Sequence, residues 1–371
     1  MFPAEKDLSE ALDKRQEQNS LRKLTLFKKS IDFTSNDYLG FAKSEVLFNM
    51  IGEKISESEK KIGSGGSRLL SGNSKEAEEL EAYFAKYYHS ESALLFNSGY
   101  DANIGLLSSI AKKGDSILYD ELVHASIHDG IRLSKADSFP VKHNDIIHLE
   151  ERLKQSSGNM YVVIESIYSM DGDIAPLREI SDLCKLHKAN LIVDEAHATG
   201  VFGKGIVHHL KLEEDIFARV HTFGKALGCH GAVVLGSQIL NEYMVNFARS
   251  FIYTTALPLH SLISIECAHE LLEKSESVQK KLHDNISYFK EKIKGSDKHH
   301  WLESKSSIQS LIVPGNNEVR ELCAKIQEKD IDVRPILNPT VPKGKERIRV
   351  CMHSYNTKEE IDLLFETIAS E

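Results

Sequence analysis

The sequence predicts an α/β fold in which a mostly parallel sheet is covered by helices on both faces. Short apolar segments alternate with helical segments between residues 92 and 237, which is the pattern of such a sheet. After Pro258 the pattern changes to a long helical stretch followed by fewer strands. We therefore expect an N-terminal helical segment (1–40), a large domain (41–255) and a small α+β domain (256–371) that includes a long connecting helix.

The expected elements of the large domain follow the chain in order. A charged helix lies within the first thirty residues, and a second helix at 74–88 has Asn73 and Glu76 as a possible capping box. A further helix begins near residue 101, and another spans about 176–188. Apolar segments predict strands at 92–96, 116–119, 161–166, 190–195, 219–223 and 231–237.

The elements of the small domain are less regular. The helical stretch after Pro258 reaches about residue 294, and a second helix lies near 317–328 before a terminal helix. The segments SLIVPG, DVRPIL and RIRVCMHS predict strands. We expect these strands to be antiparallel or mixed.

Composition excludes several classes of protein. The net charge of −9 argues against non-specific attraction to nucleic acid or anionic membranes. The beginning of the sequence has no secretory pattern, and no run approaches the roughly 18 apolar residues of a membrane span, so we expect a cytoplasmic protein. The five cysteines are scattered, which indicates reduced thiols rather than disulfides or zinc ligands.

Polar residues close several of the predicted strands, where ligands of open α/β sheets bind. Asp194 ends one strand, and the segment HTFGKALG places Lys225 after another. Taken alone, the segment around Lys225 favours a lysine of a surface turn, and Asp194 could instead be an N-cap or a salt-bridge partner. The other candidates of this kind are Asn97, Ser98, Ser169, Asp171 and His197.

The segment NSGYDANIG (97–105) forms a glycine turn that opens a helix. Free amides at a helix N-terminus bind phosphate, although the same pattern occurs in plain capped turns. His124 follows the strand SILYD, and could lie flat on an aromatic ring or be a structural histidine.

Competing motifs are weak. The glycine-rich segment 63–72 lacks the GK[ST] ending of a phosphate-loop NTPase, and there is no GxSxG elbow. His208 and His209 are adjacent, a spacing that does not suit a zinc helix, so we expect no metal.

Jointly, the pieces fit the chemistry of pyridoxal 5'-phosphate (PLP). This cofactor needs a lysine that bonds to its aldehyde, an acid on its ring nitrogen and a cup for its phosphate. We expect Lys225 to supply the amine, Asp194 the acid and the glycine turn the cup.

The sequence resembles the α-oxoamine synthases, which are fold-type I PLP-dependent transferases with a sheet of the seven-stranded type. The resemblance covers nearly the whole chain. It rests on the segments SNDYLG (35–40), GSGGSRLLSG (63–72), NSGYDAN (97–103), HASI (124–127), YSMDGD (168–173), DEAHATGVFG (194–203), HTFGKALG (221–228), FIYTTALP (251–258) and PTVPKGKERIRV (339–350).

The resemblance implies the roles of the cofactor-binding residues. Lys225 binds the cofactor, Asp194 its ring nitrogen and His197 its phenolic oxygen, while His124 stacks on the ring. The amides of Gly99 and Tyr100 and the side chain of Thr222 reach the phosphate, and Ser169 lies near the cofactor. Thr254 and Thr255 reach the phosphate of a second subunit, which implies a homodimer with shared active sites.

The family condenses an amino acid with an acyl thioester and releases CO₂. The segments FIYTTALP and PTVP are most similar to the members that join L-alanine to a pimeloyl thioester carried by coenzyme A or acyl carrier protein. Asn36 and Arg349 match positions that hold the amino acid, and Arg22 matches an arginine near the pimeloyl end. Leu337 stands where these members have an arginine, and Arg334 is its possible replacement.

Two alternatives stay open. Glycine C-acetyltransferase and serine palmitoyltransferase activities belong to the same family and differ in the amino acid and the acyl chain. A non-catalytic scaffold subunit of this fold is less favoured, because such subunits lose the cofactor lysine whereas Lys225 is present.

Overall fold

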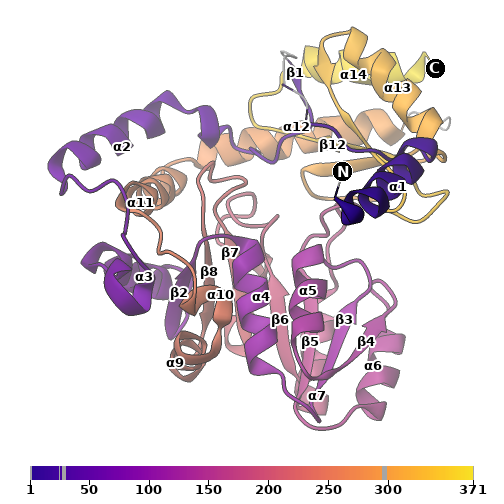
Figure 1. The fold of residues 1–371 in the computed structure, drawn as a ribbon. Helices are drawn as coiled ribbons and strands as arrows, with labels where there is room; N and C mark the ends of the chain where they lie inside the picture. Colours follow the sequence, from indigo (N-terminus) through magenta and orange to yellow (C-terminus); the bar gives the residue numbers. More distant parts are fainter. Residues whose placement is uncertain (1, 25, 27–30, 295–298, 371) are drawn as a thin grey trace. The chain divides into compact units, whose positions relative to one another are not determined.

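The computed structural model describes residues 2–24, 26, 31–294 and 299–370. The chain forms two compact units (Figure 1). The larger unit comprises residues 36–169 and 174–280, and the smaller comprises residues 1–35, 170–173 and 281–371. The smaller unit thus contains both ends of the chain. These boundaries differ from the expected division at 255/256, since α11 (Leu259–Glu273) packs against α2 (Glu45–Glu57) and α3 (Lys75–Tyr87) of the larger unit.

The larger unit is built on a seven-stranded sheet in the order β2-β8-β7-β6-β5-β3-β4. Only β8 runs antiparallel to its neighbours β2 and β7, so β2 and the other five strands share one direction. The strands are β2 (Ser92–Phe96), β3 (Ser116–Asp120), β4 (Asp137–Val141), β5 (Met160–Glu165), β6 (Asn190–Asp194), β7 (Ala218–Thr222) and β8 (Ala232–Gly236). Most are buried on both faces, which explains their continuous apolar sequences.

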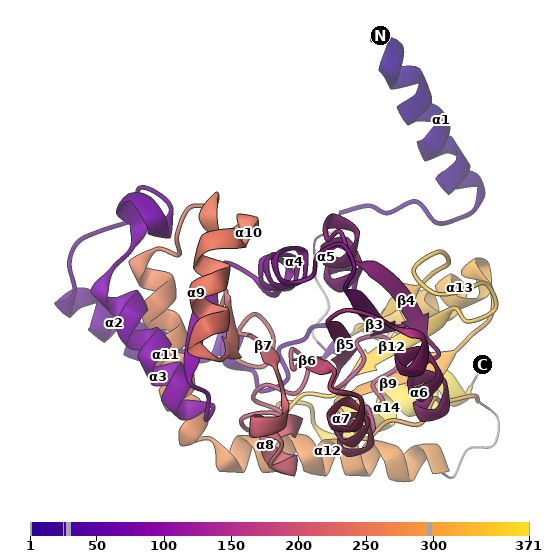
Figure 2. The same ribbon diagram turned by 90° about the horizontal axis from the view of Figure 1, so that it is seen from below.

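Helices cover both faces of this sheet. Figure 2 shows α4 (Gly99–Ile110) and α5 (Ala125–Leu133) on one face, with α7 (Leu177–His187) and α8 (Ile206–Leu210) on the other. The strands and helices enclose one apolar core. The unit also contains η1 (Phe41–Lys43), η2 (Arg68–Gly72), α6 (Ile146–Gln155), η3 (Glu213–Asp215), α9 (Gln238–Phe247) and α10 (Arg249–Ile252).

The smaller unit contains two short sheets. Strands β11 (Arg334–Ile336), β12 (Arg347–Cys351) and β9 (Ile308–Ile312) form an antiparallel sheet, while β1 (Ile31–Asp32) pairs in parallel with β10 (Ile331–Asp332). Its helices are α1 (Pro3–Glu17), α13 (Asn316–Glu328) and α14 (Lys358–Ala369). The helix α12 (Glu276–Lys294) carries the chain from the larger unit into this one.

The predicted α/β class and the mostly parallel sheet are confirmed, with differences in detail. Strand β4 escaped prediction because its sequence, DSFPV, contains proline and is largely exposed. The stretch from 258 to 294 is two helices rather than one. The expected capping box is wrong, because the N-cap of α3 is Ser74, whose Oγ accepts a hydrogen bond from the amide of Ala77.

Within the described residues, none of the helices combines the length and the apolar character needed to cross a membrane.

Candidate active site

A cavity of about 230 Å³ lies in the larger unit, at the carboxyl ends of its parallel strands. The strands converge there because β2, β3, β5, β6 and β7 run in one direction, so their following loops meet at one edge. Nine of the residues predicted from the sequence line it: Asn36, Ser98, Gly99, Tyr100, His124, Asp194, His197, Thr222 and Lys225. They are up to 189 positions apart in the chain (Asn36 to Lys225), and the fold brings them together.

One end of the cavity is formed by the N-terminus of α4. Ser98 caps this helix by accepting a hydrogen bond from the amide of Asp101. A Cβ at Gly99 would lie 2.4 Å from Cγ2 of Thr222, so only glycine fits where β7 approaches the helix. The buried Oγ1 of Thr222 has no hydrogen-bond partner among the described residues. A hydroxyl and free helix amides therefore form a cup suited to an anion.

Asp194, at the end of β6, is buried with 5% of its surface exposed. Its Oδ1 accepts a hydrogen bond from the amide of Ala196 at 2.8 Å, and its Oδ2 accepts one from Nδ2 of Asn103 at 2.8 Å. These donors stabilise an ionised carboxylate away from water. Asp194 can thus face a positively charged group in the cavity.

Asn103 also orients His124 through Ser126. Its Nδ2 donates to Oγ of Ser126 at 3.0 Å, and this Oγ lies 2.8 Å from Nδ1 of His124. The amide of Ser126 donates to the same Nδ1, so the proton of a neutral ring is on Nε2. Burial lowers the pKa of His124, and the positive charge of Lys225 acts in the same direction. The imidazole is therefore neutral and fixed in orientation.

On the other side of the cavity, Tyr38 holds His197. The hydroxyl of Tyr38 lies 2.8 Å from Nδ1 of His197 and donates to Oδ1 of Asn36 at 3.1 Å. Donating to Asn36 leaves the oxygen of Tyr38 as an acceptor for an N–H at Nδ1 of His197. Because all three side chains belong to this network, the ring of His197 is positioned before any ligand binds.

Glu165 closes β5 and lines the cavity beside Asp194 and Lys225. Burial, together with the negative charge of Asp194, raises the pKa of Glu165 to about 8. The raised pKa favours the protonated form of Glu165 near neutral pH.

Three predicted cofactor-binding residues do not line this cavity. Ser169 is buried nearby, where its amide is a hydrogen-bond donor to Glu165. Asn97 donates to Oγ1 of Thr254 at 3.0 Å and to the carbonyl oxygen of Thr255 at 2.8 Å. The contact of Thr254 and Thr255 with a second subunit stays a prediction.

The predicted substrate residues other than Asn36 belong to the smaller unit. Arg22, Arg334 and Leu337 line a cavity of about 690 Å³, and Arg22 donates to Oγ1 of Thr340 at 2.9 Å. Arg349 lies on β12 opposite Arg334 of β11. The predicted replacement of the missing arginine by Arg334 stays a prediction, and Arg334 also pairs with Asp332 at 3.1 Å. Asp171 pairs with the buried Arg347 within this unit.

Sequence reasoning missed Tyr38, Asn103 and Glu165. Glu165 is also a polar residue at the end of a predicted strand, so its position in the sequence already indicates a place at this edge of the sheet. Tyr38 and Asn103 lie in motifs that were recognised, SNDYLG and NSGYDAN. Their roles depend on contacts with residues 159 and 91 positions away, which no local pattern reveals.

The chemistry of the cavity fits PLP. An anion cup, a buried carboxylate, a neutral imidazole and a lysine are the groups that its phosphate, ring nitrogen, ring face and aldehyde require. The unpartnered Oγ1 of Thr222 supplies one donor that the described residues leave unused.

Comparison with known proteins supports this interpretation. The model of the family aminotransferase class I and II matches residues 28–368. An 8-amino-7-oxononanoate synthase from Emericella nidulans is 44% identical over 389 aligned residues, which cover 98% of this chain and 94% of that protein.

Two solved structures have a similar fold. The 8-amino-7-oxononanoate synthase from Francisella tularensis is 31% identical with a TM-score of 0.78, covering 92% of this chain and 97% of the other. Serine palmitoyltransferase from Sphingomonas wittichii is 26% identical with a TM-score of 0.87, covering 92% and 87%.

Replacing Asn103 by alanine should weaken PLP binding. The change removes a hydrogen bond to the carboxylate of Asp194, which is worth about 1.5–3 kcal/mol, and frees the Ser126–His124 pair. We expect the Kd for PLP, measured by titrating the cofactor-free protein, to rise roughly tenfold or more.

Asn246→Ala is the matched control, since this exposed asparagine donates only to the carbonyl oxygen of Glu242 within α9. Its Kd for PLP should equal that of the unaltered protein. If both variants bind PLP equally well, the hydrogen bond from Asn103 to the carboxylate of Asp194 does not contribute to PLP binding.

Proposed function

We propose that this chain, which belongs to the aminotransferase class I and II family, catalyses the PLP-dependent decarboxylative condensation of L-alanine with a pimeloyl thioester. The product is 8-amino-7-oxononanoate, as the names of its relatives in biotin synthesis indicate. The observation that carries this proposal is the convergence of Lys225, Asp194, His124 and His197 in one cavity. Coverage of the related chains from end to end supports the same reaction.

PLP supplies the electron sink that accepts the electron pair left at Cα of the amino acid. The protein's part is to hold this cofactor and to move protons. Asp194 would accept a hydrogen bond from the ring nitrogen, and its carboxylate is oriented for this by the side chain of Asn103 and the amide of Ala196. Glu165, neutral beside it, adds no competing negative charge.

The two histidines orient the ring. His124, neutral and fixed by Ser126, lies against one ring face. His197 would contact the phenolic oxygen of the cofactor, and its ring is held in place by the 2.8 Å contact between its Nδ1 and the hydroxyl of Tyr38. The N-terminus of α4 and Thr222 bind the phosphate.

Lys225 has two roles in this proposal. It would hold the cofactor through the aldehyde group when no substrate is bound. Its free Nζ would serve as the base that takes the proton from Cα of the alanine. The small residues around it, Gly224 and Ala226, leave space for the cofactor.

The substrate residues are proposed by resemblance. Asn36, on the cavity wall, contacts the bound amino acid. Arg349 binds the carboxylate of that amino acid through two parallel hydrogen bonds. Arg22, with Arg334 in place of the arginine missing at Leu337, binds the carboxylate at the far end of the pimeloyl chain. The thioester carrier is coenzyme A or acyl carrier protein.

We also propose a cytoplasmic homodimer. In it, Thr254 and Thr255 of one chain complete the phosphate site of the other, and Ser169 supports the cofactor. The support is the resemblance of the segment FIYTTALP.

Serine palmitoyltransferase is the second candidate, favoured by the structural similarity of a protein of that name. Its identity of 26% is below the 44% and 31% of the two synthases, so the alanine reaction is preferred. Glycine C-acetyltransferase differs from both in taking glycine and a short acyl chain. A scaffold role is opposed by the presence of all four cofactor residues in the cavity.

The amino acid decides among these activities. The PLP-loaded protein should show saturable changes in its visible spectrum with L-alanine at lower concentrations than with glycine or L-serine. Addition of pimeloyl-coenzyme A should then release CO₂ and coenzyme A. Preference for L-serine with palmitoyl-coenzyme A would contradict the proposal and support the second candidate.

Replacing Lys225 by arginine should abolish turnover and keep the positive charge. Arginine does not form the covalent bond, so borohydride reduction should leave no cofactor attached to the variant, as judged by mass spectrometry of the peptide. Lys211→Ala, at an exposed position after α8, is the control that should be labelled on Lys225 and remain active. Normal turnover by Lys225→Arg would refute the mechanism.

Arg349→Ala should weaken the binding of L-alanine, because the carboxylate loses its charged partner. Such losses cost about 2–4 kcal/mol, so the spectroscopic Kd should rise roughly 30- to 1,000-fold. Arg349→Lys keeps the charge without the two parallel bonds and should give an intermediate Kd. An unchanged Kd in Arg349→Ala would show that another residue binds the carboxylate.

A further inference from the structure

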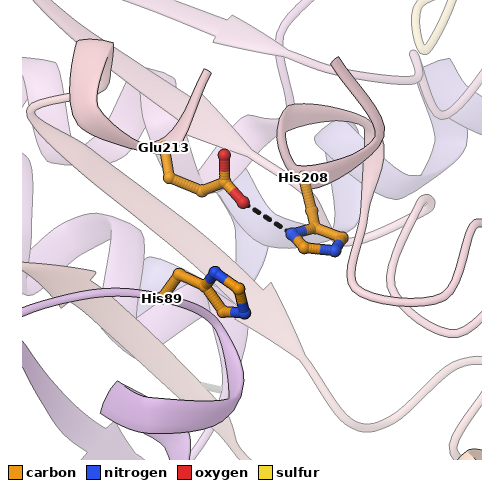
Figure 3. A group of neighbouring side chains, drawn as sticks. All are labelled: His89, His208 and Glu213. Atoms are coloured by element: carbon orange, nitrogen blue, oxygen red, sulfur yellow. Dashed lines mark hydrogen bonds and ion pairs between the residues drawn. The ribbon is translucent and has the colours of Figure 1, made fainter. Parts of the chain in front are cut away.

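Three potential metal ligands meet on the larger unit, outside the cavity described above. His89 follows α3, His208 lies in α8, and Glu213 begins η3. Each offers one ligand atom, and these atoms all lie within 4.8 Å of one another. Figure 3 shows the three side chains pointing toward a common space. Nδ1 of His208 lies 2.5 Å from Oε1 of Glu213, and the rings of His89 and His208 are 5.1 Å apart.

The backbone around His89 is fixed before any ion binds. His89 has a left-handed conformation (φ 53°) just after α3, and its amide donates to the carbonyl oxygen of Lys86. The buried Arg219 donates to the carbonyl oxygens of Tyr88 at 2.8 Å and His89 at 3.2 Å. This guanidinium, contributed by β7, anchors the end of α3 beside α8.

The backbone of α8 is fixed in a similar way. The buried carboxylate of Glu195 accepts hydrogen bonds from the amides of Ile206 and Val207 at 2.8 and 2.9 Å. These bonds hold the first turn of the short helix that carries His208. Hydrogen bonds therefore fix the backbone of His89 and of His208. Little conformational entropy is lost there when an ion binds.

The charge at the site suits a cation. Glu213 contributes a carboxylate ligand, and its Oε1 lies against Nδ1 of His208. The ammonium of Lys204 already lies 3.4 Å from Nε2 of His89, where it also stacks over the ring of Tyr87 at 4.6 Å.

We propose that His89, His208 and Glu213 bind one Zn²⁺ ion, with a water molecule as the fourth ligand. Two imidazoles and a carboxylate are a ligand set that Zn²⁺ prefers. Zinc bonds to nitrogen and oxygen of about 2.0–2.2 Å place tetrahedral ligand atoms about 3.3–3.5 Å apart. To reach this spacing, the 2.5 Å contact between Nδ1 of His208 and Oε1 of Glu213 has to open, and the ammonium of Lys204 has to leave Nε2 of His89.

The bound ion would stabilise the larger unit rather than take part in its chemistry. It would connect the end of α3 to α8 and η3, which are more than 115 positions away in the chain. None of the three ligands lines the cavity that holds Lys225. Because Zn²⁺ binds the folded state, stability rises with the logarithm of its concentration above Kd. No local pattern predicts this site, because the adjacent His208 and His209 have an unsuitable spacing and His89 is distant in the chain.

The test is a calorimetric titration of the PLP-loaded, chelator-treated protein with ZnCl₂. We expect one Zn²⁺ per chain, a rise in Tm with Zn²⁺, and no effect of Mg²⁺, which prefers oxygen ligands. In His89→Asn the Kd should rise at least about tenfold, since one of three ligands is lost. Asparagine tolerates the left-handed backbone at this position, so the variant should fold.

His209→Ala is the matched control, because this exposed histidine is next to His208 and outside the cluster. It should bind Zn²⁺ as the unaltered protein does. Glu213→Gln keeps an acceptor for His208 and removes the charge, so it should weaken binding as His89→Asn does. The proposal is overturned if no Zn²⁺ binds, or if His89→Asn and Glu213→Gln bind it as tightly as His209→Ala.

Discussion

The arrangement of the active site depends on one buried negative charge. Asp194 lies at the end of β6, the central strand of the sheet, where water is largely excluded. A carboxylate is costly in such a place unless donors surround it. The amide of Ala196 and the side chain of Asn103 supply those donors, and Asn103 extends the network through Ser126 to His124. The groups proposed to contact the ring nitrogen and the ring face are thereby fixed as a single unit.

Glu165 shows why this negative charge is localised. It lies at the end of the neighbouring strand β5, opposite Asp194 in the register of the two strands. Two adjacent buried carboxylates do not both ionise readily, because each charge raises the pKa of the other. Both carboxyl groups accept hydrogen bonds from nearby donors, and burial together with the charge of Asp194 raises the pKa of Glu165 to about 8. The raised pKa favours the protonated form of Glu165, so the two neighbouring groups do not both have to carry a charge.

The fold class and most of the residues that line the proposed cofactor cavity could be predicted from the sequence, and the reasons are physical. Buried parallel strands have continuous apolar sequences, and polar residues at their ends must meet at one edge of the sheet. Asp194 and Lys225 follow from that rule. The strand β4 could not be found, since an exposed edge segment with proline carries no such signal. Tyr38 and Asn103 could not be assigned a role, because each acts on a residue brought near only by folding. The cluster of His89, His208 and Glu213 could not be predicted either, because folding brings these distant residues together.

The proposed function divides between the two units in a way that bears on specificity. Every residue that lines the proposed cofactor cavity belongs to the larger unit. The arginines proposed to bind the two carboxylates, Arg349 and Arg22, belong to the smaller one. The chemistry of PLP accounts for the loss of CO₂ but not for the choice of acyl chain. A pimeloyl group differs from an acetyl or palmitoyl group in carrying a terminal carboxylate, and such a group is selected by a charge rather than by chain length. The cationic residues of the smaller unit are therefore where this enzyme would differ from relatives that share its cofactor chemistry.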